Sequence, residues 1–296
     1  MKLNADCCYC LMKRKMSEIE NCNDEEKRGE YIRRAMVAIG SAKDKETSPV
    51  VLARTDQIYA DIFGELPNFE RFERIKKEYN TLVLGMYPSI EARVKESGDE
   101  ILLALKLAMA GNYIDFGAMG TIENDKLHAL LEKAENNDVS IDEFADFIKN
   151  LKSSKKLVYL TDNCGEIVLD KFFITVLKKH FPHLEITAIV RGSAVLNDAT
   201  LEDAIAVGLT EIVEVIGNGT GVAGTDLATI SDEAKKKINE ADMIISKGQG
   251  NFETLHGCGL NIFYGFLCKC DWFVRNFNLE RFKGVFINEK NQKIKR

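Results

Sequence analysis

The chain has 296 residues, of which 45% are hydrophobic and 29% charged, and its formal net charge is −6 at pH 7. This composition is typical of a globular protein with a buried core; it excludes intrinsic disorder, and the negative charge argues against nucleic acid as a partner. Apolar runs of about 18 residues are absent and the first residues lack the apolar segment of a signal peptide, so we expect no membrane partner and a cytoplasmic location.

The chain up to about residue 150 is predicted to be helical, because its apolar residues recur at helical spacings. Glu100–Ala110 is apolar nearly all round, which predicts a buried helix ending at Gly111. Ser140, with Glu143 three residues later, predicts a capping box at the start of a further helix. We therefore expect a helical domain over residues 1–152.

The rest of the chain alternates short β-branched runs with helical segments. The predicted strands are Lys156–Thr161, Leu184–Val190, Glu211–Ile216, Asp242–Ser246 and Val285–Asn288. The aromatic stretch Phe263–Phe266 is expected in the core. The alternation predicts an α/β fold in which residues 153–296 form a Rossmann-like, open and mainly parallel sheet with helices on both faces.

Polar residues and glycines follow each of the first four predicted strands. The four groups are Asp162–Glu166, Arg191–Thr200, Gly217–Gly221 and Ser246–Asn251. Because ligands bind beyond the carboxyl ends of the strands in such sheets, the four groups predict a functional site at one edge.

The residue types in these loops point to phosphoryl chemistry at a divalent cation. Asp162, Asn163 and Asp198 offer hard oxygen donors, which suit Mg²⁺ or Mn²⁺ better than zinc. Lys247 is a point charge for a phosphate oxygen, and Gly248 and Gly250 would let backbone N–H groups approach an anion. The plainer interpretation of the same residues is helix capping and an ordinary turn.

A second pattern in this region suggests a different function. Gly219–Gly224 matches the G-x-G-x-x-G fingerprint of dinucleotide-binding folds and follows a strand. The fingerprint should open a helix directly, whereas the next helix is predicted only from Ser231 onward. An NAD(P)-binding oxidoreductase is therefore the less favoured alternative.

The eight cysteines include Cys7 and Cys10, which have C-x-x-C spacing. They are expected to be free thiols, and two interpretations stay open: small buried side chains, or a metal or redox site. The second interpretation gives another alternative function, a non-catalytic metal- or nucleotide-binding module with redox-active thiols.

Several motifs in the chain resemble the damage-control phosphatase family, once catalogued as domain of unknown function 89. They are the C-x-x-C at Cys7 and Cys10, Ala110–Gly117, the motif from Asp162 to Asp170, Arg191–Gly192 with Leu196–Thr200, and Ser246–Asn251. The similarity extends from residue 7 to about residue 271. The C-x-x-C, with no kinase fusion, resembles the stand-alone microbial branch.

The resemblance implies a metal-dependent phosphomonoester hydrolase acting on small phosphometabolites, such as sugar phosphates or damaged metabolites. It implies Asp162, Asn163 and Asp198 as ligands of Mg²⁺ or Mn²⁺, with Ni²⁺ or Co²⁺ as alternatives. Ser246–Gly250 is implied as the phosphate-binding loop. Lys269 matches a further phosphate contact, although its neighbours depart from the Arg-Thr-x-Lys pattern of some eukaryotic members.

The catalytic roles are hypotheses at this point. Glu166 is the candidate for orienting an attacking water, while Asp162 is the alternative as a covalent nucleophile. Asn112 and Asp115, which follow the buried helix, are candidate contacts for the rest of the substrate. The expected partner is a small phosphorylated metabolite, and no oligomeric state is predicted.

Overall fold

The structure is a computed structural model that describes residues 1–113, 132, 139–277 and 280–291. Its helices in chain order are α1 (Ala5–Glu18), α2 (Glu25–Gly40), α3 (Ser48–Phe63), α4 (Phe69–Lys95), α5 (Glu100–Ala110), η1 (Gly111–Tyr113), α8 (Ile141–Ser153), α9 (Glu166–His180), α10 (Leu201–Ala206), α11 (Asp232–Glu240), α12 (Gln249–Leu255), α13 (Asp271–Phe277) and η2 (Glu289–Asn291). Its strands are β1 (Lys156–Leu160), β2 (Glu185–Val190), β3 (Glu214–Gly217), β4 (Met243–Lys247), β5 (Ile262–Leu267) and β6 (Gly284–Asn288). Within these residues no helix is both long and apolar enough to cross a bilayer.

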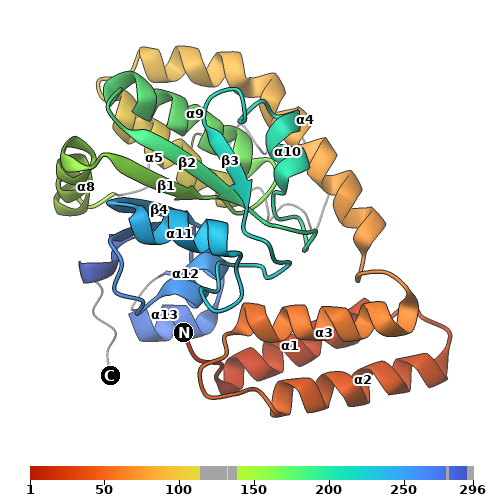
Figure 1. The fold of residues 1–296 in the computed structure, drawn as a ribbon. Coiled ribbons are helices and arrows are strands. Elements are labelled where there is room, and N and C mark those ends of the chain that lie inside the picture. Colours follow the sequence, from red (N-terminus) through yellow and green to blue (C-terminus); the bar gives the residue numbers. More distant parts are fainter. Residues whose placement is uncertain (114–131, 133–138, 278–279, 292–296) are drawn as a thin grey trace.

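The six strands form a single sheet in the order β3-β2-β1-β4-β5-β6 (Figure 1). The pairs from β3 to β5 are parallel, and β6 is antiparallel to β5. The carboxyl ends of β1 to β4 therefore lie along one edge, with the order reversing next to β1. The predicted α/β fold class is confirmed.

Side chains that alternate along the strands build two cores, one on each face of the sheet. Leu157 and Tyr159 of β1 pack with the apolar stripes of α4, α5, α8 and α9. Val158 and Leu160 face the opposite way and pack with α11, α12 and α13. The result is a three-layer arrangement in which the sheet lies between the two groups of helices (Figure 1).

The first three helices form a separate group beside this sandwich (Figure 1). They bury two small clusters of their own, one around Leu11 and Val51 and the other around Tyr31. Leu196 and Ala223, from the loops after β2 and β3, pack against the first cluster, so α1–α3 adjoin the loop edge of the sheet. The domain boundary between residues 152 and 153 stays a prediction; the core of α4, α5 and α8 continues across it into β1 and α9.

Most predicted elements are confirmed, with local differences. The buried helix is confirmed at Glu100–Ala110. Ser140 caps α8 by accepting the Glu143 N–H at 3.5 Å, but the Glu143 carboxylate accepts the Asn288 N–H instead of completing a capping box. The aromatic stretch Phe263–Phe266, predicted only as core, belongs to the strand β5. All six residues of β5 are buried, so the sequence shows no alternation there that would predict a strand.

Asp203, in the first turn of α10, ties that helix to α4. Its Oδ2 lies 2.8 Å from Lys76 Nζ and accepts the Thr200 N–H and hydroxyl at 2.9 and 2.8 Å. Burial alone raises the pKa of Asp203, but the hydrogen bonds from Lys76 and Thr200 outweigh burial and lower this pKa below its ordinary value. The ionised form is therefore the one that the folded state favours.

We expect Asp203→Asn to lower the free energy of unfolding by about 2 kcal/mol near pH 7, because it removes a charge-assisted hydrogen bond. A lowered pKa in the folded state stabilises above the unfolded pKa of about 3.9, and this contribution is lost as the pH falls through the folded value. The difference in the free energy of unfolding between wild type and variant, measured by urea titration, should thus narrow as the pH falls below about 5. Asp61→Asn, at the exposed pair with Arg34, is the control, and a pH-independent difference for Asp203→Asn would contradict the assignment.

Candidate active site

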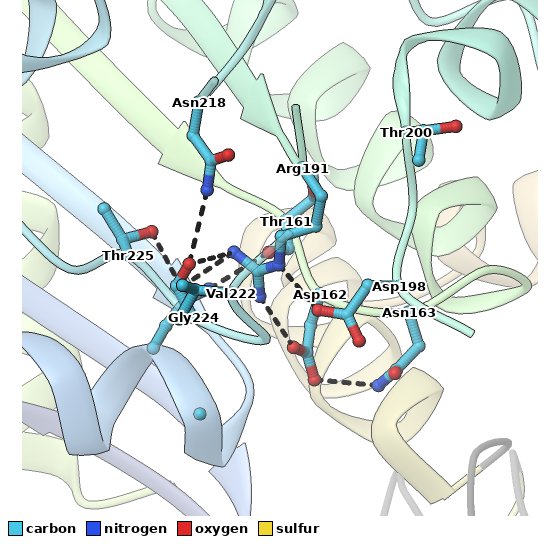
Figure 2. A network of polar contacts seen from close by, with 12 residues as sticks. Thr161, Asp162, Asn163, Arg191, Asp198, Thr200, Asn218, Val222, Gly224 and Thr225 are labelled. Carbon is cyan, nitrogen blue, oxygen red and sulfur yellow. Dashed lines mark hydrogen bonds and ion pairs between the residues drawn. The ribbon is translucent and has the colours of Figure 1, made fainter. Parts of the chain in front are cut away.

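The loops after β1 and β2 are joined by backbone hydrogen bonds that bring the three predicted metal ligands together. The Ala199 N–H donates to the Asp162 carbonyl oxygen at 2.8 Å, and Asn163 and Asp198 form an isolated antiparallel bridge. Asp162, Asn163 and Asp198 consequently lie side by side at the sheet edge (Figure 2). All three are buried.

Arg191, directly after β2, connects this group to the other loops. Its Nε donates to Asp198 Oδ2 at 2.6 Å, and Nη2 donates to Asp162 Oδ1 at 3.2 Å. Nη1 donates to the Gly224 carbonyl at 3.1 Å and to Asn251 Oδ1 at 3.0 Å. The guanidinium is 2% exposed and lies between the two carboxylates and the loop at Gly224 (Figure 2). Sequence reasoning gave Arg191 no role; its place at the end of a strand, like that of Asp162, was the available signal.

The G-x-G-x-x-G pattern has a structural explanation. Asn218 Nδ2 donates to the Gly224 carbonyl at 3.3 Å, which helps to aim that oxygen at the arginine. A Cβ on Gly224 would lie 2.7 Å from the Gly250 carbonyl oxygen, and one on Gly250 would overlap with the Ala223 carbonyl. The glycines thus allow the loops after β3 and β4 to touch, and α11 begins only at Asp232. This geometry does not support a dinucleotide site.

Lys247 and Ser246 lie on opposite faces of the sheet, because side chains alternate along β4. The Lys247 ammonium donates to Glu166 Oε1 and Asp170 Oδ1, both at 2.7 Å, and to the Ala108 carbonyl at 2.8 Å. All three N–H groups are therefore used. The Ser246 hydroxyl is buried without a hydrogen-bond partner among the described residues. Their phosphate-binding roles stay predictions, and this arrangement does not favour them.

Asn112 connects Glu166 to Asp162 through hydrogen bonds. Asn112 Nδ2 donates to Asp162 Oδ2 at 3.1 Å and to Glu166 Oε2 at 3.0 Å, while its Oδ1 accepts the Leu267 N–H at 3.2 Å. Asn163 Nδ2 donates to the same two carboxylates, at 2.7 Å to Asp162 and 3.1 Å to Glu166. Glu166 as the water-orienting residue and Asn112 as a substrate contact stay predictions. Asp115 lies outside the described residues.

The site gathers several buried charged side chains of both signs. Four buried carboxylates, Asp162, Glu166, Asp170 and Asp198, face two buried cations, Arg191 and Lys247, and the charge of the half-buried Lys269 also acts on Asp162. Burial raises the pKa of Asp162 well above its ordinary value, and Asp198 and Glu166 raise it further, whereas Arg191 and Lys269 lower it. Burial also raises the pKa of Asp170 to about 6, against the effect of Lys247.

Of the remaining predicted phosphate ligands, Gly248 lies against the Asp162 carboxylate and Gly250 against the Ala223 carbonyl. Gly248 has φ +82° and its N–H donates to the Gly265 carbonyl at 3.1 Å, so this amide is already paired. Lys269 follows β5, is half-buried, and is held through its N–H by Gln249 Oε1 at 3.1 Å. The positive charge of Lys269 lowers the pKa of Asp162. Unlike Lys247, Lys269 is partly exposed, so its ammonium is the predicted phosphate ligand that solvent can reach.

We expect Gly248→Ala to disrupt the site. A Cβ there would overlap with the Asp162 carboxylate, and the positive φ adds strain of about 1–3 kcal/mol for a non-glycine residue. Gly257→Ala is the matched control, since Gly257 has φ +87° with no atom within 4 Å of its Cβ position. Circular-dichroism melting of both variants should give a larger loss for Gly248→Ala. Equal losses would mean that backbone strain alone acts and that Asp162 does not restrict residue 248.

The Cys7 thiol, at the start of α1, is not activated. All eight cysteines are free, Cys10 is exposed, and burial raises the pKa of Cys7 to about 11. A redox-active thiol needs a lowered pKa to form thiolate at neutral pH. No group of three or more His, Cys, Asp or Glu side chains in the described part of the chain is arranged to hold a metal ion. The thiol alternative therefore gains no support.

Comparisons with known proteins agree with the fold and the motifs. The family described as Damage-control phosphatase ARMT1-like domain matches residues 3–283. An uncharacterized protein of Methanocaldococcus jannaschii is 30% identical, over 86% of this chain and 84% of its own length. A damage-control phosphatase of Pyrococcus horikoshii is 28% identical over 99% of both chains, and one of Archaeoglobus fulgidus is 28% identical over 94% of this chain and 96% of its own.

A solved structure shows the same fold. The crystal structure of a DUF89 family protein from Pyrococcus horikoshii superposes with a TM-score of 0.85 at 24% identity, covering 98% of this chain and 99% of that one. The family match over residues 3–283 confirms the resemblance that the motifs indicated. The chain belongs to the ARMT1-like family of damage-control phosphatases.

Proposed function

We propose that this protein is a divalent-cation-dependent phosphatase that hydrolyses phosphomonoesters of small metabolites, sugar phosphates and damaged metabolites among them. The observation that carries the proposal is the buried convergence of Asp162, Asn163 and Asp198 at one point of the sheet edge, where backbone hydrogen bonds hold their loops together. Two carboxylates and an amide oxygen brought together in a buried place form a set of oxygen donors that a divalent cation would occupy. Because the chain belongs to a phosphatase family, we propose that the cation takes part in phosphate hydrolysis.

The donor set fits Mg²⁺ or Mn²⁺. Asp162, Asn163 and Asp198 would hold the cation through oxygen atoms, which are the ligands of these hard ions. Mg²⁺ is usually bound by one or two carboxylates, with water and substrate phosphate completing the shell, so a cluster of three acidic or histidine side chains is not needed. Ni²⁺ and Co²⁺ are alternatives that the assay below includes.

Arg191 and Lys269 would have different roles in this reaction. The cation, when bound, would neutralise charge on the phosphoryl oxygens and acidify water. Arg191 would keep the carboxylates of Asp162 and Asp198 turned toward one another through its two hydrogen bonds. Lys269 would approach the phosphate from its half-buried position and compensate charge on a further oxygen.

The attacking group is either a water or Asp162 itself. Glu166 would be a poor general base for that water, because three donors of this chain already occupy its carboxylate: Lys247, Asn112 and Asn163. The free thiols of all eight cysteines fit a reducing, cytoplasmic compartment, which we include in the proposal.

Phosphate release from sugar phosphates and from an aryl phosphate tests the proposal. The reaction is run with Mg²⁺, Mn²⁺, Co²⁺ or Ni²⁺ and with EDTA. We expect release that requires a cation and that Asp198→Asn abolishes while the variant stays folded. Turnover that survives both EDTA and Asp198→Asn would belong to a contaminant or to a different mechanism, and the proposal would then be wrong.

A further inference from the structure

A buried chain of hydrogen bonds runs from the core of the sheet into the site. Tyr159 Oη donates to Asp170 Oδ1 at 2.6 Å, and the Lys247 ammonium joins that same oxygen to Glu166 Oε1. Each of these four side chains is at most 1% exposed. A group so enclosed acts on its neighbours and not on a molecule arriving from solvent.

Glu166 transmits this chain to the two asparagines of the site. Its Oε2 and Asp162 Oδ2 both accept from Nδ2 of Asn112 and from Nδ2 of Asn163. If either amide were flipped, its oxygen would face two carboxylate oxygens, and all of these atoms are acceptors. The two carboxylates therefore fix the orientation of each amide. In Asn163 this orientation turns Oδ1 away from Glu166, so that this oxygen can serve as a metal ligand.

Lys247 also holds the elements that carry these residues. It belongs to β4, bonds to Glu166 and Asp170 of α9, and donates to Ala108 near the end of α5, after which η1 presents Asn112. Loss of the ammonium would leave two buried carboxylates without a cation, and Glu166 would no longer be fixed in one rotamer.

We infer that Lys247, together with Asp170 and Tyr159, is a positioning residue that orients Glu166 and, through it, the amides of Asn112 and Asn163. This inference rests on the proposed function, because it concerns the cation site that the function requires. It assigns Lys247 a task different from the phosphate contact that its sequence neighbourhood predicts. Replacing a residue that hydrogen-bonds to a metal ligand and orients it typically lowers metal affinity or activity by about 10- to 100-fold.

The test measures Mn²⁺ affinity of the metal-free protein by electron paramagnetic resonance, and inhibition by inorganic phosphate at saturating Mn²⁺. Asp170→Asn and Lys247→Met should weaken Mn²⁺ binding by about 10- to 100-fold. Tyr159→Phe, which removes one hydroxyl, should give a smaller change in the same direction. The inhibition constant for phosphate and KM should stay within about twofold while kcat falls, as expected when substrate contacts are intact.

Tyr264→Phe is the matched control, because Tyr264 is a buried tyrosine on the other face of the sheet, and it should leave Mn²⁺ affinity unchanged. A raised phosphate inhibition constant in Lys247→Met with unchanged Mn²⁺ affinity would make Lys247 a phosphate ligand and overturn the inference. Unchanged Mn²⁺ affinity in folded Asp170→Asn and Tyr159→Phe would overturn it as well. These two variants keep the ammonium and decide the question if Lys247→Met does not fold.

Wild-type protein is measured first, so the two proposals fail in different ways. Wild type that binds no Mn²⁺ and releases no phosphate contradicts the proposed function and this inference with it. Wild type that binds and hydrolyses, with variants equal to it in Mn²⁺ affinity, contradicts only the inference.

Discussion

Asp162→Asn is expected to lower kcat/KM for cation-dependent phosphate release by about a thousandfold, which corresponds to about 4 kcal/mol at 1.36 kcal/mol per factor of ten. The change removes one of the two carboxylates at the proposed cation site and one of the two that Arg191 bridges. It also puts an amide where Asn112 and Asn163 require an acceptor at Oδ2. Steady-state phosphate release at saturating Mg²⁺ or Mn²⁺ gives the measurement.

The control for this variant is Asp242→Asn, at the opposite edge of the sheet. Asp242 Oδ2 accepts the N–H groups of Lys155 and Lys156 at 2.8 and 2.9 Å, where β1 begins. The substitution is chemically the same, but it removes a structural hydrogen-bond acceptor far along the strands from the site. Its turnover should match wild type, with a modest loss of stability. Comparable losses of activity in both variants would show that Asp162 matters only for folding.

The largest expected loss of stability belongs to Arg191→Met. Methionine fills a similar volume but removes the buried cation that bridges the carboxylates of Asp162 and Asp198. It also removes one of the two donors to the Gly224 carbonyl and one of the two to Asn251 Oδ1. Removing one member of a buried ion pair typically costs about 3–5 kcal/mol. Urea unfolding of the metal-free protein at pH 7 measures this difference in the free energy of unfolding.

The same substitution at an exposed pair provides the comparison. Arg275 Nη2 lies 2.6 Å from Asp6 Oδ2, the same distance as Arg191 Nε from Asp198, but both partners are more than half exposed. Exposed pairs contribute about 0–1 kcal/mol, so Arg275→Met should change stability little. A loss at Arg191 no greater than that at Arg275 would mean that the site does not depend on the buried guanidinium.

The location of the site follows from local patterns in the sequence. Strands that alternate with helices give a parallel sheet, and carboxyl ends of parallel strands share one edge, so the convergence of Asp162, Asn163 and Asp198 was predictable. The backbone bridge between Asn163 and Asp198 makes that convergence tight. Family motifs pointed to the same residues, and the match over residues 3–283 confirms the family.

The partners of the charged residues did not follow from local patterns. Lys247 lies one residue beyond the predicted end of its strand, whereas β4 includes it, and strand alternation then directs its ammonium toward α9. Arg191 bonds to Asn251, 60 positions away, a pairing that only the packed loops create. The residues of β5 are predicted only as core, because a strand that is buried on both faces lacks the alternation of apolar and polar residues that predicts a strand.

The contact between the loops after β3 and β4 has a consequence for how such a protein can diversify. Side chains do not fit at Gly224, Gly248 or Gly250, because a neighbouring backbone or Asp162 occupies the space. Natural variation in these loops would separate them and displace the acidic group, so the reacting centre is expected to resist sequence drift. The helices α1–α3 pack against the same edge at Leu196 and Ala223, but none of their residues belongs to the contact between the two loops. A new substrate preference would therefore arise most readily in this helical group, which can change its surface while the chemistry beside it stays constant.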